Sequence, residues 1–214
     1  MQKADELAEG LLATSLWNEL PPAERSAAAA AVRNGEYPFN AAEIPVLYDA
    51  DGEELAEGQV EEFLTTLAPA MRSAGVELTV STAEPVDDAD DSYAVLINGT
   101  RCQIAESRFD VSWLDATVKP LAQLNALLAR AGSPLRWHTL QAGGNDGWAL
   151  LIEPSVADLM TRSGLFDAKD IPAEALGDDT VEDSAKRSAT SRTAASDARG
   201  RGGWLERLRR GGRG

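Results

Sequence analysis

The sequence predicts an α+β fold with a mostly antiparallel sheet and helices on one face of it. In several segments apolar residues recur at three- and four-residue spacing, which is typical of amphipathic helices. Other segments are short, apolar and rich in β-formers, and Asn98-Gly99 joins two of them directly, as in a type I′ hairpin. With 214 residues, of which 43% are apolar, the chain can bury one ordinary core.

Residues 1–36 are expected to form an N-terminal helical hairpin packed on the main domain. Pro21 and Pro22 interrupt its apolar stripe and suit the start of a second helix, which Asn34 and Gly35 end. The stripe that predicts the first helix consists of Leu7, Leu11, Leu12, Leu16, Trp17 and Leu20.

Residues 37–176 are expected to form the α+β domain. A helix with Val60, Phe63, Leu64 and Leu67 on one face should end at Gly75. Ser155 and Asp158 form the pattern of a capping box for a last short helix that ends near Gly164. The other predicted elements are strands at 44–48, 76–80, 93–97, 100–105, 136–141 and 148–153, and a helix at 118–131.

Two stretches of this domain resemble each other. Met71–Gly75 and Leu128–Gly132 both end a predicted helix in Ala-Gly, and each is followed by a strand, a polar loop and an apolar strand. This order predicts a duplicated helix-strand-strand unit. The alternative is convergence, because Ala-Gly helix ends and apolar strands are common.

Charge divides the chain into an acidic body and a basic end. The whole chain carries −15, but residues 1–185 hold 11 Lys and Arg against 33 Asp and Glu, a net −22, and residues 186–214 hold 9 against 2, a net +7. Residues 177–203 contain almost nothing apolar and are expected to be a disordered linker. Residues 204–214 form a basic amphipathic motif, whose candidate partner-binding residues are Trp204, Leu205, Leu208, Arg207, Arg209 and Arg210.

The amino-acid composition excludes several classes of function. One cysteine, Cys102, excludes an intrachain disulfide and a zinc site built mainly from thiolates, and one histidine, His138, leaves few transition-metal sites. No apolar run approaches the roughly 20 residues that span a bilayer, and the first twenty residues are acidic, unlike a secretory signal. The sequence therefore predicts a cytoplasmic protein without a cofactor.

The segment Val46-Leu-Tyr-Asp-Ala-Asp-Gly52 carries one motif with a known chemistry. It resembles the first motif of haloacid dehalogenase-like phosphotransferases, and the resemblance implies Asp49 as nucleophile, Asp51 as general acid and a bound Mg²⁺. The further residues that the resemblance implies are Ser81 or Thr82, Lys119, and the metal-binding acids Asp178, Asp179 and Asp183 after Gly177.

The same residues also predict a plain turn. Glu53 stands where that family has a threonine, and the hairpin at 93–105 interrupts the alternation of helix and parallel strand that the family requires. The competing interpretation is a chain reversal that Asp49 and Asp51 cap.

The remaining chemical candidates have structural explanations. Glycine falls at Gly52 and breaks the spacing of a calcium loop, and Asp87, Asp88, Asp90 and Asp91 read as a solvated acidic loop. His138 lies in the middle of a predicted strand, where a hydrogen-bonded structural histidine is expected, and Cys102 reads as a small buried residue. Residues 143–147 are expected to be a hairpin loop, without the lysine or helix start of a phosphate-binding loop.

Abundant acidity without a catalytic constellation favours a non-catalytic protein-interaction or adaptor protein. We expect a protein partner for the acidic body and a second contact through the basic tail, which is also the only part suited to nucleic acid or anionic membrane. No small-molecule substrate is identified. The alternative of a different class is a Mg²⁺-dependent phosphotransferase using Asp49 and Asp51.

Overall fold

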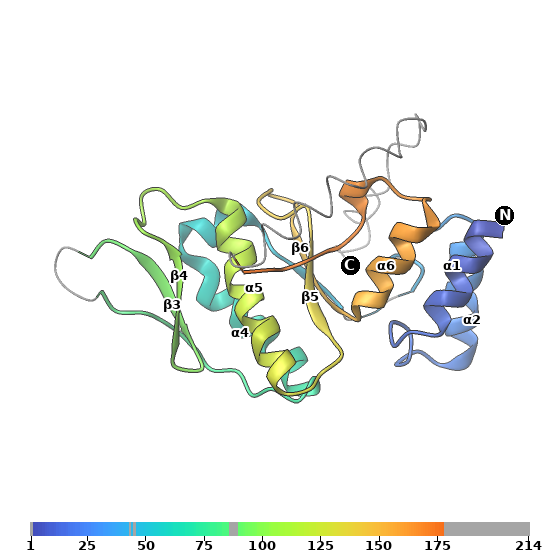
Figure 1. Cartoon of the computed structure of the whole chain (residues 1–214), viewed down its shortest axis with the longest axis horizontal. Coiled ribbons are helices and arrows are strands. Elements are labelled where there is room, and N and C mark those ends of the chain that lie inside the picture. Colours follow the sequence, from blue (N-terminus) through green and yellow to red (C-terminus); the bar gives the residue numbers. More distant parts are fainter. Residues whose placement is uncertain (1, 43, 45, 86–89, 178–214) are drawn as a thin grey trace, which may run out of the picture.

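The structure is a computed structural model that describes residues 2–42, 44, 46–85 and 90–177. Helices and sheets alternate along its long axis (Figure 1). Helices α4 (Val60–Ser73) and α5 (Trp113–Arg130) separate a three-stranded sheet from a four-stranded sheet. Helices α6 (Pro154–Ser163), α1 (Gln2–Leu12) and α2 (Pro22–Arg33) lie beyond the outer face of the four-stranded sheet. None of the helices in the described ranges is both long and apolar enough to cross a bilayer.

The predicted α+β class and antiparallel pairing are confirmed. The four-stranded sheet has the order β1 (Leu47–Asp49), β6 (Trp148–Ile152), β5 (Arg136–Leu140), β7 (Ala173–Glu174), and the three-stranded sheet has the order β2 (Val80–Thr82), β3 (Tyr93–Ile97), β4 (Thr100–Ala105). All strand pairs in the described residues are antiparallel. The strands divide into two sheets, and α4 and α5 pack against both of them.

Two apolar cores lie on opposite faces of the four-stranded sheet, because successive side chains of a strand point to opposite sides. Trp137 and Leu151 face α4, α5 and the three-stranded sheet. Leu140 and Leu150 face α6 and the N-terminal helices. Helices α1 and α2 thus share a core with β6.

The predicted hairpin at 93–105 is confirmed. Asn98 and Gly99 have φ of 48° and 76°, the two positive values of a type I′ turn, and β3 pairs with β4 directly on either side of them. The two predicted helix-strand-strand units are α4-β2-β3 and α5-β5-β6. Their helices end alike, since Val76 N–H donates to Met71 C=O at 2.8 Å and Ser133 N–H donates to Leu128 C=O at 3.0 Å.

Several predicted boundaries are wrong. Helix α1 ends at Leu12, because the backbone N–H groups that follow donate to carbonyls three residues earlier and not four. The Thr14 hydroxyl also donates to the Leu11 carbonyl at 2.8 Å. The side chains of Leu16, Trp17 and Leu20 still enter the core, from turns and not from a helix. Apolar spacing alone did not distinguish these two arrangements.

The helix starts also differ from the predictions. Helix α5 begins at Trp113, five residues before the predicted start, with the Ser112 hydroxyl accepting a bond from Asp115 N–H at 3.3 Å. The predicted capping box at Ser155 is wrong, because α6 begins at Pro154, which presets the first helical φ, and the Ser155 hydroxyl donates to the Glu153 carboxylate. The strand predicted at 76–80 is displaced to β2, and β7 was not predicted.

The Asn125 side chain joins α5 to β5 and to the end of the described chain. Its amide donates to the carbonyls of Trp137 and Ala175 at 2.9 and 3.0 Å, and its oxygen accepts from Trp137 N–H at 2.6 Å. Asn125 is buried, so water does not replace these bonds. The α5–β5 junction therefore depends on one polar side chain.

We predict that Asn125→Ala lowers the free energy of unfolding by about 3 kcal/mol, because it leaves the buried Trp137 N–H without an acceptor. Urea denaturation followed by circular dichroism measures this change. Gln123→Ala, which removes a half-exposed side chain from the same helix, is the matched control and should have a small effect. A loss below about 1 kcal/mol for Asn125→Ala would contradict the assignment.

Candidate functional site

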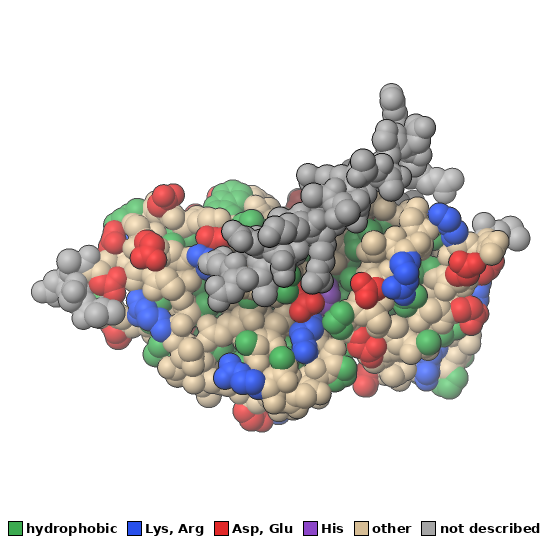
Figure 2. Space-filling model, in the orientation of Figure 1, with side chains coloured by type: hydrophobic (Ala, Val, Ile, Leu, Met, Phe, Trp, Pro, Cys, Tyr) green, Lys and Arg blue, Asp and Glu red, His purple; other side chains and the backbone are tan. Residues whose placement is uncertain are grey.

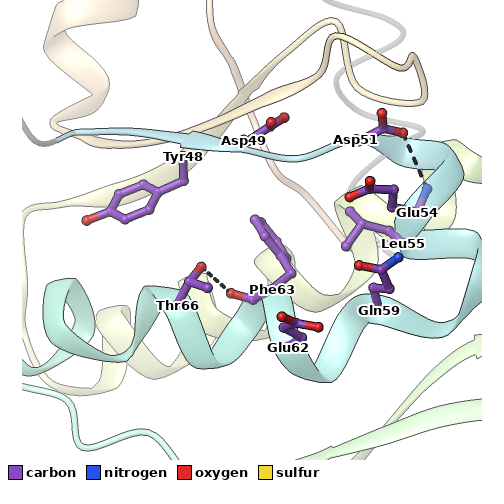
Figure 3. A pocket seen from close by; sticks show the side chains of 9 residues that line it. All are labelled: Tyr48, Asp49, Asp51, Glu54, Leu55, Gln59, Glu62, Phe63 and Thr66. Atoms are coloured by element: carbon purple, nitrogen blue, oxygen red, sulfur yellow. Dashed lines mark hydrogen bonds between the residues drawn. The ribbon is translucent and has the colours of Figure 1, made fainter. Parts of the chain in front are cut away.

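A pocket of about 240 Å³ lies between β1 and the helical segment that follows it. In Figure 3, Tyr48, Asp49 and Asp51 occupy the strand side, and Glu62, Phe63 and Thr66 line the helical side. Glu54, Leu55 and Gln59 complete the wall at the bend between the two sides. We call these nine residues the acidic pocket.

Asp51 sets the geometry of the bend. Its carboxylate accepts bonds from the backbone N–H groups of Glu53 and Glu54 at 2.9 and 3.3 Å, and so caps α3 (Gly52–Glu54). The segment η1 (Leu55–Gln59) follows, and its helical path is broken by a kink at Gly58, which has φ of 112°. A side chain at Gly58 would be strained in this conformation, so glycine allows the turn that brings Gln59 and Glu62 opposite the strand.

The loop between β5 and β6 supports the strand side of the acidic pocket. Ala50 N–H donates to Gly147 C=O at 2.9 Å, and Gly52 N–H donates to Gly144 C=O at 3.0 Å. A Cβ on Gly147 would lie 2.5 Å from the Ala50 carbonyl oxygen, which only glycine avoids. The predicted hairpin loop at 143–147 is therefore a structural support for residues 49–52.

The acidic pocket has an apolar floor and a polar rim. Leu55 and Phe63 are buried, whereas Asp49, Glu54 and Glu62 are exposed. Four carboxylates line the pocket, and no lysine, arginine or histidine does. None of the four is ion-paired within the described part of the chain.

The surroundings of Asp49 raise the pKa of its carboxyl. Although the residue is exposed, its neighbours partly desolvate the carboxyl, and this desolvation is the largest cause that raises its pKa above the ordinary value. The nearby carboxylates of Asp51 and Asp146 raise it further, and a backbone hydrogen bond at Ala50 opposes them. Tyr48 lies beside it with a phenol pKa that burial raises, so the ring remains neutral. A ligand that brings positive charge would relieve the repulsion among these carboxylates.

The structure separates the residues that the phosphotransferase resemblance implies. Asp49 and Asp51 line the same pocket, but the Asp51 carboxylate caps α3, as the turn interpretation expects. Lys119 is on α5, where its ammonium donates to the Ile104 carbonyl at 3.1 Å and pairs with Asp115 at 3.1 Å. Thr82 is in the other sheet and donates to Glu61. Asp178, Asp179 and Asp183 lie outside the described residues.

The other candidates have structural partners. His138 is buried on β5, its Nδ1 lies 3.0 Å from the Arg136 carbonyl oxygen, and burial lowers its pKa. Burial raises the pKa of the Cys102 thiol to about 11, which keeps it protonated and unreactive. Asp90 pairs with Arg101 and Asp91 accepts a bond from Ser107, while Asp87 and Asp88 are outside the described ranges. Within those ranges, no group of three or more histidine, cysteine, aspartate or glutamate side chains is arranged to hold a metal ion.

Seven of the nine lining residues were not singled out from the sequence as members of a site. Trp204, Leu205, Arg207, Leu208, Arg209 and Arg210 lie outside the described residues. The residues that sequence reasoning missed as site members are Tyr48, Glu54, Leu55, Gln59, Glu62, Phe63 and Thr66. The dense run of acids at 49–62, interrupted by Gly58, was the available signal.

Comparison with known proteins gives no family for this chain. No model of a protein family matches it, and neither the curated proteins nor the solved structures include a significant match. The site must therefore be interpreted from its own geometry.

We predict that Asp51→Asn lowers the pKa of Asp49 towards the ordinary aspartate value, because it removes one of the charges that raise it. Asparagine still caps a helix, so α3 should persist. Carboxyl carbon shifts followed by NMR across a pH titration measure the change. Glu77→Gln, at an exposed site beside Arg72, is the control and should leave Asp49 unchanged.

The pH dependence of stability follows from the same shift. Because the folded chain holds the Asp49 proton to higher pH than the unfolded chain does, this carboxyl contributes stability at low pH. That contribution falls as the pH rises from the ordinary value of 3.8 through the raised pKa. A pKa for Asp49 at or below 3.8 would contradict this account of the site.

Proposed function

We propose that this protein is a non-catalytic protein-interaction module whose acidic pocket binds a basic segment of a protein partner. The observation that carries the proposal is a pocket with four carboxylates, no basic side chain in its lining and no ion pair to any of these carboxylates among the described residues. The basic motif at 204–214 is a second docking element of the same protein.

The shape of the acidic pocket suits an arginine or lysine side chain. Such a side chain has an apolar stem and a charged head, and the pocket offers buried Leu55 and Phe63 beneath a rim of carboxylates. A guanidinium can also form paired bonds to a carboxylate and stack on an aromatic ring. We therefore assign the preferred ligand as an arginine-containing peptide segment.

The charge of the whole body favours the same class of partner. The net −22 of residues 1–185 attracts basic segments over distances of about a Debye length, roughly 10 Å at 0.1 M salt, and repels nucleic acid. Binding at an exposed, charged rim should be fast and sensitive to salt.

We predict that Glu54→Gln with Glu62→Gln weakens binding of a short Arg-Ser repeat peptide roughly tenfold, because it removes two of the four rim charges. Fluorescence anisotropy of the labelled peptide at low and high salt measures the affinity. Salt should weaken binding to the native chain more than binding to the double variant.

Glu57→Gln is the matched control for this experiment. Glu57 is exposed in the kinked segment η1, between the two rim residues in sequence, but does not line the pocket, so its loss changes the net charge without changing the site. Equal weakening by the control and by either single rim variant would indicate a general charge effect and would contradict a specific site.

The second candidate function is a Mg²⁺-dependent phosphotransferase, and the presence of Asp49 and Asp51 in one pocket is the observation that favours it. Hydrolysis of an aryl phosphate with Mg²⁺, abolished by Asp49→Asn, would establish that function. The interaction proposal predicts no hydrolysis above the uncatalysed rate with either chain.

A further inference from the structure

An apolar patch is exposed beside the acidic pocket. Phe109, Trp113 and Leu114 are 85%, 39% and 51% exposed, and they account for three of the four large hydrophobic side chains that are exposed in the described ranges. Figure 2 shows hydrophobic side chains gathered at the surface where α5 begins, with acidic side chains nearby. We call Phe109, Trp113 and Leu114 the α5 patch. The three lie within six residues of sequence, Phe109 in the turn that precedes α5 and Trp113 and Leu114 in its first turn.

The backbone beneath the α5 patch is well supported. The Ser112 hydroxyl caps α5, and the Ser107 hydroxyl accepts a bond from Phe109 N–H at 3.3 Å. The Trp113 Cβ lies 3.1 Å from the position that a Cβ on Gly52 would occupy, so Trp113 packs directly against the start of α3. The fixed backbone presents a preformed surface for docking.

Carboxylates flank the α5 patch. Glu106, Asp110 and Asp115 belong to the same segment, and Asp51 and Glu53 stand on either side of Gly52. The two nearby cations are engaged with the body, since Lys119 pairs with Asp115 and the Arg108 guanidinium donates to the Asp91 carbonyl. The patch is thus apolar at its centre and acidic around it.

The C-terminal motif of the same chain has the complementary pattern. Trp204, Leu205 and Leu208 recur at the spacing of one helical face, and the neighbouring charges are mainly arginine: Arg207, Arg209, Arg210 and Arg213. Such a segment is too short to be a stable helix alone, but a groove or patch can order it on binding.

The chain is long enough for this contact. Residues 178–203 separate the described end, Gly177, from Trp204. Fully extended, a segment of that length reaches at most about 90 Å. A domain of this size has a radius of gyration of about 16 Å, so the motif can reach the surface where α5 begins.

We propose that residues 204–213 dock on the α5 patch of their own chain, with Trp204, Leu205 and Leu208 against Phe109, Trp113 and Leu114 and the arginines against the flanking carboxylates. A tethered motif acts at an effective concentration of roughly millimolar. A motif with an intrinsic Kd of about 0.1 mM is therefore docked in about nine chains out of ten.

Hydrogen exchange measured by mass spectrometry on two full-length chains tests this contact. One chain is the natural sequence, and the other carries Trp204→Ser, Leu205→Ser and Leu208→Ser, which leave its charge unchanged. We expect amides in residues 108–115 to exchange about tenfold faster in the substituted chain at low salt. Phe109→Ser with Leu114→Ser should accelerate exchange in residues 204–210 in the same way, while Leu165→Ser, at the other exposed leucine, should not.

Unchanged exchange at residues 108–115 in the tail variant would overturn the proposal. Protection that increases with protein concentration would also overturn it, because it would show docking between two chains. Peptide binding at the acidic pocket is tested separately through Glu54 and Glu62. A negative result for tail docking therefore does not contradict the proposed function, and a negative result for peptide binding does not contradict tail docking.

Discussion

The buried Trp137 side chain holds the layers of this protein together. Its indole Nε1 donates to the Met71 sulfur at 3.2 Å, and its ring meets the Tyr48 ring edge-on with centroids 5.4 Å apart. Its backbone N–H and C=O both bond to Asn125, and its C=O also accepts from Ala175 N–H. Helices α4 and α5, strand β1 and the end of the described chain therefore meet at one residue of β5. Because Tyr48 and α4 also form part of the acidic pocket, the core fixes the positions of the strand and helical walls.

The acidic pocket is held by the backbone of its neighbours and not by bonds between its carboxylates. One carboxylate oxygen of Asp51, Oδ1, accepts both bonds that cap α3, and Gly58 and Gly147 allow the tight turn and close contact around it. Glu54 and Glu62 are exposed, and the pKa of Asp49 is raised mainly by desolvation of its carboxyl and further by the charges of Asp51 and Asp146. A site of this kind favours recognition of charge more than chemistry at a bond.

Local patterns predicted the elements better than their assembly. The Asn98-Gly99 turn and strands β5 and β6 followed directly from turn chemistry and β-propensity, which act over a few residues. The stripe through Leu16 and Leu20 was misassigned to a helix, since turns can bury the same residues. The two-sheet arrangement and the acidic pocket depend on contacts between β1, α4 and residues 143–147, and no periodicity encodes these. The aspartates of the 49–52 turn were recognised as capping residues. Glu54 and Glu62 line the same pocket only because the chain bends at Gly58, which the sequence pattern did not predict.

The central claim is that a basic segment binds at the acidic pocket. Backbone amide chemical shifts of the full-length chain, followed by NMR during titration with a short arginine-rich peptide, locate binding residue by residue. The account predicts that the largest shifts fall within residues 48–66 and follow one salt-sensitive binding curve. Shifts spread evenly over the acidic surface, or concentrated away from residues 48–66, would contradict it.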